Sequence, residues 1–390
     1  MISLLNADKV LKDIYLTAVS EEMNKSNPFY TAIQKGSENI EGRRAVLACR
    51  YGVNGGIASR PETESLPTAS INNFANFTLD LANIYGVIEI SDKAVRASES
   101  NQGAMINLLN YQMESLLDSA KFNFNRMLWQ DGSGIIGRAR GTNSAALTIN
   151  VHNAANFREG MILDVFNQTT NNPRILGVRV VSVNRDARSV TFETPSGSGF
   201  AANENDFFTL QGSRNNEILG LAHLFSTTAT NLYGMDRASF PHLLPIRVNN
   251  EGGALTADAI QSAIDRIEEK VDNAPNMILT NFATRRKYLN HLQTTRTNID
   301  FLNLDGGFKA ISYSGIPVIA DRFCHEDAMF FLNTDDFKLV QLCDWEWIEG
   351  DNGRILTQVP NRAAYSATLV KYANLGCTKP FAQAKLTNFA

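Results

Sequence analysis

The stretch GAMINLLNYQMESLLDSAKFNFNRMLWQ, from Gly103 to Gln130, has the pattern of one long amphipathic helix. Its apolar residues follow one another mostly in steps of three and four, and they are Met105, Leu109, Met113, Leu116, Leu117, Ala120, Phe124, Met127 and Leu128. Ser98, Ser100 and Asn101 offer N-cap oxygens before it, and Gly132 and Gly134 end it. A rise of 1.5 Å per residue gives a rod of roughly 40 Å. The apolar face is too broad and irregular for a two-stranded coiled coil, and a buried helix of an ordinary α/β domain is the alternative.

Composition sets the broad class of the protein. The chain has 390 residues, more than one compact core usually holds, so two or more lobes are expected. A net charge of −4 without any Lys/Arg run gives no general affinity for nucleic acid. Four cysteines without a Cys-x-x-Cys pair are typical of free thiols in a cytosolic protein. No apolar run approaches a membrane span and no signal peptide is evident, so we expect a soluble protein made in the cytoplasm.

Upstream of the helix, the sequence predicts an arm and a long finger. Residues 6–20 form an amphipathic pattern that Asn27-Pro28 interrupts, and a short segment with Phe29, Tyr30 and Ile33 follows. These pieces hold too few apolar residues for a core of their own, so we expect an arm that lies on something else. Arg44–Tyr51 alternates as a strand, and a second, longer strand is expected from Phe77 to Ile90. The segment between them is rich in Gly, Pro, Ser and Thr, and a long hairpin with such a polar tip is not stable alone. We therefore expect the finger to rest on a neighbouring molecule.

Within the finger, the candidate contact residues are Asn54, Arg60, Glu62 and Glu64. Their charged side chains are expected to meet a neighbour, each exposed pair contributing at most about 1 kcal/mol.

Residues 132–137 match the Gly-x-Gly-x-x-Gly pattern of dinucleotide-binding proteins. That fingerprint requires a strand before it and a helix after it. Here a helix precedes the glycines and Arg138-Ala-Arg140 opens none, so we interpret them as a helix stop. No cofactor is expected.

Residues 141–213 have the pattern of a small β-barrel or sandwich inserted in the chain. Five or six short strands alternate with Asn/Asp/Gly/Pro turns. The expected interior residues are Leu147, Ile149, Ile162, Val165, Val180, Val183, Val190 and Phe192. From Gly220 the chain is mixed, with a capped helix at residues 256–271, a basic helix after Asn281 and a late strand at residues 363–375, which indicates an α+β lobe.

The order of these parts, together with three local stretches, resembles the major capsid proteins of tailed phages with the Hong Kong 97 type of fold. The stretches are Glu217-Ile-Leu-Gly-Leu221, Tyr313-Ser-Gly-Ile-Pro-Val-Ile-Ala-Asp321, and Tyr365-Ser-Ala-Thr-Leu-Val-Lys371 with Pro380-Phe381-Ala382. The resemblance implies an α+β capsid fold whose subunits assemble as pentamers and hexamers into an icosahedral shell around the phage genome. The implied domains are an N-terminal arm (1–43), an extended loop and start of the peripheral domain (44–98), the spine helix (99–140), the inserted β domain (141–213), the axial domain (214–360) and a returning C-terminal strand (361–390).

The resemblance also implies partners and a location. These are further copies of the chain, a portal, a decoration protein, and enclosed DNA bound without sequence specificity, in a virion made in the bacterial cytoplasm. Because the arm begins at once, scaffolding is expected from a separate protein. Some relatives form a covalent bond from a lysine on the extended loop, but this chain has no lysine between Lys35 and Lys93. An encapsulin-type nanocompartment shell is the nearest alternative.

No catalytic or metal constellation is recognisable, so no enzyme is expected. Cys324 and His325 are adjacent, and neighbours in a strand point to opposite faces, which favours a structural role. Arg285, Arg286 and Arg296 are interpreted as a solvated helix face or a subunit contact rather than a phosphate site. A glycan-binding β-module protein, resting on residues 141–213, is the alternative from a different class.

Overall fold

The computed structural model describes residues 27–68, 70–71, 73–93, 102–271, 274–294, 301–303, 309–350 and 353–389. The expected helix at residues 6–20 and the expected N-cap residues lie outside these ranges. Chain contacts divide the protein into two compact units. Of the described residues, the first unit holds 82–223 and 345–370, and the second holds the others.

The long helix of the first unit is α5 (Gln102–Trp129), which confirms the prediction to within one residue at each end. Gly132 and Gly134 follow it with φ values of +85° and +78°, a conformation that glycine adopts without strain. The last turns of α5, from Phe124 to Trp129, are buried all round, since Arg126 and Trp129 are buried beside the predicted apolar face.

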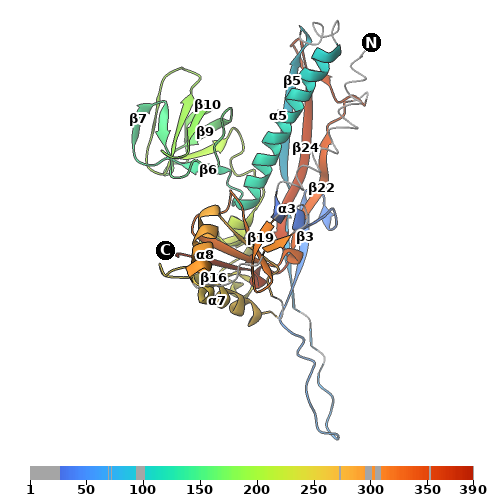
Figure 1. Ribbon diagram of the computed structural model, residues 1–390. Coiled ribbons are helices and arrows are strands. Elements are labelled where there is room, and N and C mark those ends of the chain that lie inside the picture. The colour runs from blue at the N-terminus through green and yellow to red at the C-terminus, as the bar shows by residue number, and fades with distance from the viewer. Residues whose placement is uncertain are drawn as a thin grey trace. The chain divides into compact units, whose positions relative to one another are not determined.

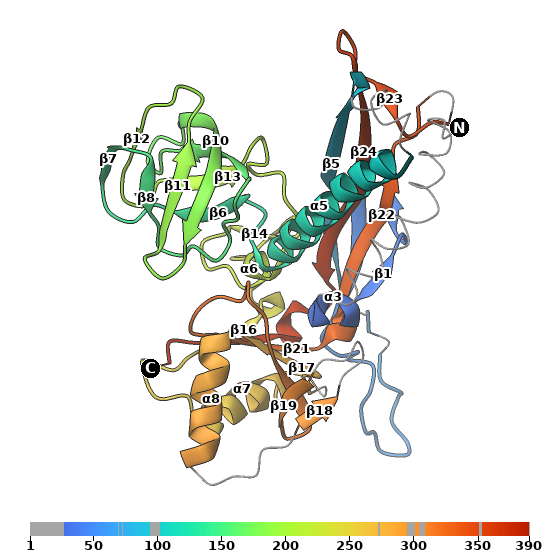
Figure 2. The ribbon, with the colours of Figure 1, turned by 45° about the horizontal axis from the view of Figure 1, so that its top comes forward.

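Strand β5 (Ala82–Ser91) lies along α5 (Figures 1 and 2). The approach is close: a Cβ at Gly86 would lie 2.9 Å from Leu116 of the helix. β5 pairs with β24 (Ala364–Cys377), which also pairs with β23 (Thr357–Gln358) and β22 (Phe337–Trp347).

The prediction of one continuous strand from Phe77 to Ile90 was wrong. β4 (Asn73–Asp80) ends before Leu81 and pairs with β3, whereas β5 belongs to another sheet. The buried positions are odd-numbered in β4, at Phe77 and Leu79, and even-numbered in β5, at Ile88 and Ile90. Because a strand alternates faces with period two, one uninterrupted strand does not bury both sets on one face.

The β-rich part of the first unit follows α5. Its strands are β6 (Ile135–Arg138), β7 (Asn143–Ala146), β8 (Thr148–Asn150), β9 (Ile162–Phe166), β10 (Pro173–Asn184), β11 (Ser189–Glu193), β12 (Phe200–Ala202) and β13 (Phe207–Leu210). Six of them form one sheet in the order β6-β13-β9-β10-β11-β8, and β12 pairs with β7. An antiparallel bridge between Ala139 and Val151 joins the ends of the two edge strands, so the sheet curls toward closure around its own core.

Five of the eight interior residues predicted for this region are buried, namely Ile149, Val165, Val180, Val190 and Phe192, and Val183 packs partly against them. Leu147 and Ile162 are 39% and 47% exposed, so their prediction as interior was wrong. Ile162 is paired with the exposed Arg179 on the outer face of the sheet, and Leu147 precedes β8 rather than lying in it. β6 also extends the sheet upstream of the predicted boundary at Gly141. A separately folding inserted domain stays a prediction.

The second unit is built on a seven-stranded mixed sheet. Its order is β16 (Ile246–Asn249), β25 (Ala384–Thr387), β21 (Ala328–Leu332), β17 (Met277–Thr280), β20 (Ile316–Ala320), β19 (Lys309–Tyr313) and β18 (Phe301–Asn303). Helix α7 (Ala257–Glu268) packs its Ile260, Ile264 and Ile267 into the core beside the sheet, and α8 (Phe282–Thr294) adds Tyr288 and Leu292 (Figure 2). The predicted caps are confirmed, with Thr256 accepting from the Ala259 N–H and Asn281 from the Thr284 N–H. The shorter elements are α6 (Leu221–Leu224), β14 (Asn231–Leu232), β15 (Met235–Asp236), η2 (Pro241–Leu243), η3 (Thr334–Asp336) and η4 (Pro380–Ala382).

The chain enters the second unit through α3 (Pro28–Ala32) and β1 (Gln34–Gly36), which runs parallel to β22. A three-stranded sheet of β2 (Ile40–Glu41), β3 (Arg44–Tyr51) and β4 follows. Phe29 and Tyr30 are 0% and 2% exposed, and the Phe29 ring meets Phe337 edge-on at 5.4 Å. For the residues from 27 onward, the expectation of an arm lying on something else is therefore corrected, because this part belongs to the core of its own unit.

Candidate interaction surface

The segment between β3 and β4, called the extended loop here (residues 52–72), is the clearest candidate for a functional surface. β3 and β4 pair in register from Arg44 with Asp80 to Tyr51 with Asn73, and the pairing then stops. Beyond it, the described loop residues form neither helix nor strand, and Figure 1 shows the loop running out past the strand ends. Its internal bonds are local, such as Gly56 N–H to Asn54 Oδ1 at 2.8 Å.

The root of the extended loop is firmly held in the second unit. The Phe77 ring of β4 packs edge-on against buried Tyr233 at 5.5 Å, and the Thr78 N–H donates to the Tyr233 carbonyl. Burial also raises the pKa of the Tyr233 hydroxyl. The ring of Tyr51, the last residue of β3, packs against the His242 ring with a centroid distance of 4.9 Å and a tilt of 47°. The strands are thus fixed up to the point where the loop begins.

The extended loop exposes four aliphatic side chains that sequence reasoning missed. Val53, Ile57, Leu66 and Ile71 are 86%, 89%, 87% and 86% exposed. The prediction of a simply polar tip was therefore incomplete. Fully burying one such side chain yields about 1.5–3 kcal/mol, so a partner surface that covers several of them gains substantially. The available signal was the presence of four aliphatic residues in a stretch otherwise made of turn formers.

The structure places all four predicted contact residues on this loop but brings only two of them together. Arg60 and Glu64 form an exposed ion pair with a 3.7 Å N–O distance, and the Glu64 N–H donates to the Pro61 carbonyl. Glu62 is exposed between them, and the Asn54 side chain closes the turn to Gly56. Their contact with a neighbour stays a prediction.

The other sequence candidates do not assemble into a reactive centre. Cys324 and His325 lie in a turn between β20 and β21, so the argument from strand alternation was wrong, although the two side chains do differ, the first buried and the second exposed. Burial raises the pKa of the Cys324 thiol well above its usual value, so the thiol stays protonated near neutral pH. Arg285 lies over the exposed Phe282 ring at 5.5 Å, Arg286 is exposed, and Arg296 lies outside the described residues.

Within the ranges that the structure describes, no three His, Cys, Asp or Glu side chains gather so as to hold a metal ion. In the same ranges, no helix has the length and apolar content needed to cross a bilayer.

Comparison with known proteins yields structural rather than sequence matches. No protein-family model and no curated protein sequence matches the chain. A chain of the capsid asymmetric unit of cyanophage A-1(L) is similar in structure with a TM-score of 0.54 and 13% identity, over 93% of this chain and 92% of that one. The chain therefore shares its fold with that chain of the cyanophage capsid.

Two further matches are more distant. A chain of the holo-SrpI encapsulin complex from Synechococcus elongatus PCC 7942 has a TM-score of 0.48 at 11% identity, covering 93% of this chain and 88% of that one. The capsid of Myoviridae phage XM1 gives 0.45 at 9% identity, covering 92% and 90%. With TM-scores below 0.5, neither establishes a shared fold by itself.

Proposed function

We propose that this chain is the major capsid protein of a tailed phage, a subunit that assembles with copies of itself into an icosahedral shell around the genome. The observation that carries the proposal is the extended loop. It has a firmly held root, it carries four aliphatic side chains that are more than 80% exposed, and none of its described residues is buried. Four large apolar side chains exposed on one loop offer apolar area that a partner surface can bury, and the fold shared with a capsid chain supports another subunit as that partner.

In this proposal the parts take the roles that the Hong Kong 97 type of fold gives them. Residues 1–43 are the N-terminal arm, 44–98 the extended loop and start of the peripheral domain, and 99–140 the spine helix. Residues 141–213 are an inserted domain, 214–360 the axial domain, and 361–390 the returning C-terminal strand. Separate scaffolding, portal and decoration proteins are the expected partners. The mildly acidic chain encloses DNA without binding it tightly.

The glycan-binding alternative loses support from the β-rich part. Residues 141–213 contain no Tyr or Trp, and all six of their Phe side chains are buried. No aromatic face is left there to receive a sugar ring.

The test is electron microscopy of the full chain expressed alone and with its flanking genes. Closed shells that contain nucleic acid are the expected result. Shells that contain a packaged protein instead would favour the encapsulin alternative. A chain that stays monomeric under both conditions would overturn the proposal.

A further inference from the structure

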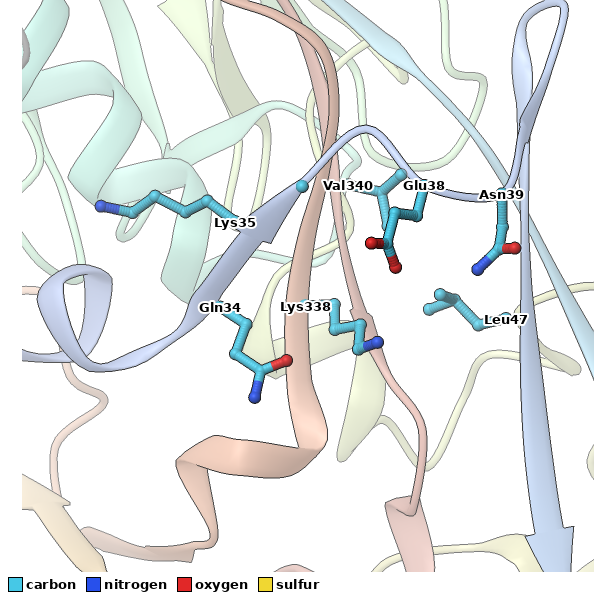
Figure 3. Close-up of a pocket in the computed structure, with 8 residues that line it drawn as sticks. Gln34, Lys35, Glu38, Asn39, Leu47, Lys338 and Val340 are labelled. Carbon is cyan, nitrogen blue, oxygen red and sulfur yellow. The ribbon is translucent and has the colours of Figure 1, made fainter.

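A small polar pocket in the second unit lies between β1, β22 and the β3 sheet. Its volume is about 140 Å³, and it is lined by Gln34, Lys35, Gly36, Glu38, Asn39, Leu47, Lys338 and Val340 (Figure 3). The floor is apolar, since Leu47 and Val340 are almost fully buried. A water molecule takes up about 30 Å³, so the pocket has room for roughly one side-chain head group with a few waters.

The pocket contains two opposite charges that are held apart. Figure 3 shows the Glu38 carboxylate, the Asn39 carboxamide and the Lys338 ammonium directed into the same space, while Lys35 points away. Lys35 lies over the Tyr30 ring at 3.8 Å. Glu38 and Lys338 form no ion pair with any described residue. Both line the pocket, so a charged group that enters the pocket can pair with either of them.

The extended loop carries the complementary charges. Its only charged residues are Arg60, Glu62 and Glu64, and the charged side chains directed into the pocket are Glu38 and Lys338. The loop supplies one cation and one anion through Arg60 and Glu64. The pocket supplies one anion and one cation through Glu38 and Lys338. An arginine head group also suits a site that offers a carboxylate, because the two form charge-assisted, often bidentate hydrogen bonds.

We infer that the pocket receives the loop tip of a second copy of the chain, with Arg60 binding Glu38 and Glu64 binding Lys338. The loop of the same copy is directed elsewhere. β3 runs from Leu47 at the pocket to Tyr51, and the loop continues from there beyond the strand ends (Figure 1). The inference rests on the proposed function, because it names the surface on which the extended loop docks.

Charge exchange in the full-length chain tests the assignment. The pocket swap E38K/K338E and the loop swap R60E/E64R each place like charges together, and each is expected to lower the yield of shells at least about tenfold. The quadruple variant restores opposite charges and is expected to return to within about twofold of the wild type. Thr63→Lys, a charge change at an exposed residue of the same loop outside the assigned pairs and outside the predicted contact residues, is the matched control and is expected to assemble within about twofold of the wild type.

Thermal unfolding of each purified subunit separates a folding defect from an assembly defect. Near-normal yield from either swap overturns the inference, and so does a quadruple variant as defective as the swaps. If the pocket swap fails to fold, the loop swap still decides, because its two residues are in an exposed loop. If the wild-type chain forms no shells, the proposed function is overturned together with this inference. If the wild type forms shells but the swaps assemble normally, only this inference is overturned.

Discussion

Arg126 and Glu217 lie 91 residues apart in the sequence and form a bidentate ion pair in the interior of the first unit. Arg126 Nη1 lies 2.9 Å from Glu217 Oε2, Nη2 bonds Oε1, and the two side chains are 0% and 1% exposed. Close by, a Cβ on Gly220 would lie 2.4 Å from the Leu128 carbonyl, so only glycine fits against this turn of α5. The segment that leaves the β-rich part is thus attached to the end of the long helix.

Breaking this pair is expected to destabilise the first unit strongly. Glu217→Ala leaves a buried guanidinium without its counter-charge, and the expected loss is about 3–5 kcal/mol in the free energy of unfolding. The apolar replacement R126M/E217L removes both charges and is expected to recover most of that loss. Urea unfolding followed by tryptophan fluorescence measures it, because Trp129, Trp345 and Trp347 all lie in the first unit.

Glu193→Ala is the matched control, because Glu193 pairs with Arg179 at 3.9 Å on the surface with both side chains more than 60% exposed. It is expected to cost less than about 1 kcal/mol. An E217A midpoint equal to that of the control would contradict the role given to the pair.

The β-rich part is expected to fold alone only when β6 is included. Ile136 and Ala139 are 3% and 0% exposed, and β6 pairs with β13 through Phe207 and Phe208. A fragment of residues 133–214 should therefore melt cooperatively. A fragment of residues 141–213 loses the burial of Ile136, worth about 1.5–3 kcal/mol, and should melt lower by roughly 10 °C. Calorimetry of the two fragments measures this, and a disordered longer fragment by NMR would show that these strands depend on the rest of the unit.

The sequence predicted those features that depend on local signals. The periodicity of α5, its glycine stop and the caps at Thr256 and Asn281 are read within a few residues, and each is present. Features that depend on distant partners were missed. The burial of Arg126 requires Glu217, and the burial of Phe29 requires Phe337.

The extended loop was predicted as a segment, but the exposure of its aliphatic side chains was not. The local sequence does not show whether an aliphatic side chain will be buried against another part of the protein. The change of sheet between β4 and β5 was missed for a related reason, because apolar residues occur on both sides of Leu81 and only the change in their parity marks the break.

The buried Asp336 is expected to make stability depend on pH. Gln383 Nε2 donates to Asp336 Oδ2 at 3.1 Å, and Lys379 Nζ lies 3.4 Å from Asp336 Oδ1. Both partners favour the charged carboxylate, but the effect of burial is larger and raises the pKa of Asp336. The folded state therefore binds a proton more tightly than the unfolded state, so this residue's contribution to stability falls as the pH rises from about 4 through the folded pKa. Asp336→Asn removes the titration.

The melting temperature of the wild type minus that of D336N should accordingly become more negative between about pH 4 and pH 7. Asp335→Asn, at the exposed neighbouring position, is the control and should give a smaller trend. A difference that grows more positive over the same range would contradict the assigned sign.

Assembled particles are expected to be held by non-covalent contacts alone. The extended loop offers no lysine for an amide cross-link, so large mixed interfaces must supply the association energy. Mature particles boiled with reductant and run on a denaturing gel should give one band near 43.0 kDa. A ladder of resistant multimers would reveal a covalent link between subunits.

Deletion of residues 54–70 tests the central claim, that the extended loop joins one subunit to the next. The loop contributes no described residue to the core of its own unit, and its root is fixed by Tyr51 and Phe77, which the deletion retains. The variant should therefore keep the melting temperature of the wild-type subunit within a few degrees. Mass photometry of the two proteins, expressed under the same conditions, should show shells from the wild type and only free subunits or small oligomers from the deletion. Shells of normal size and yield from the deletion variant would contradict the account.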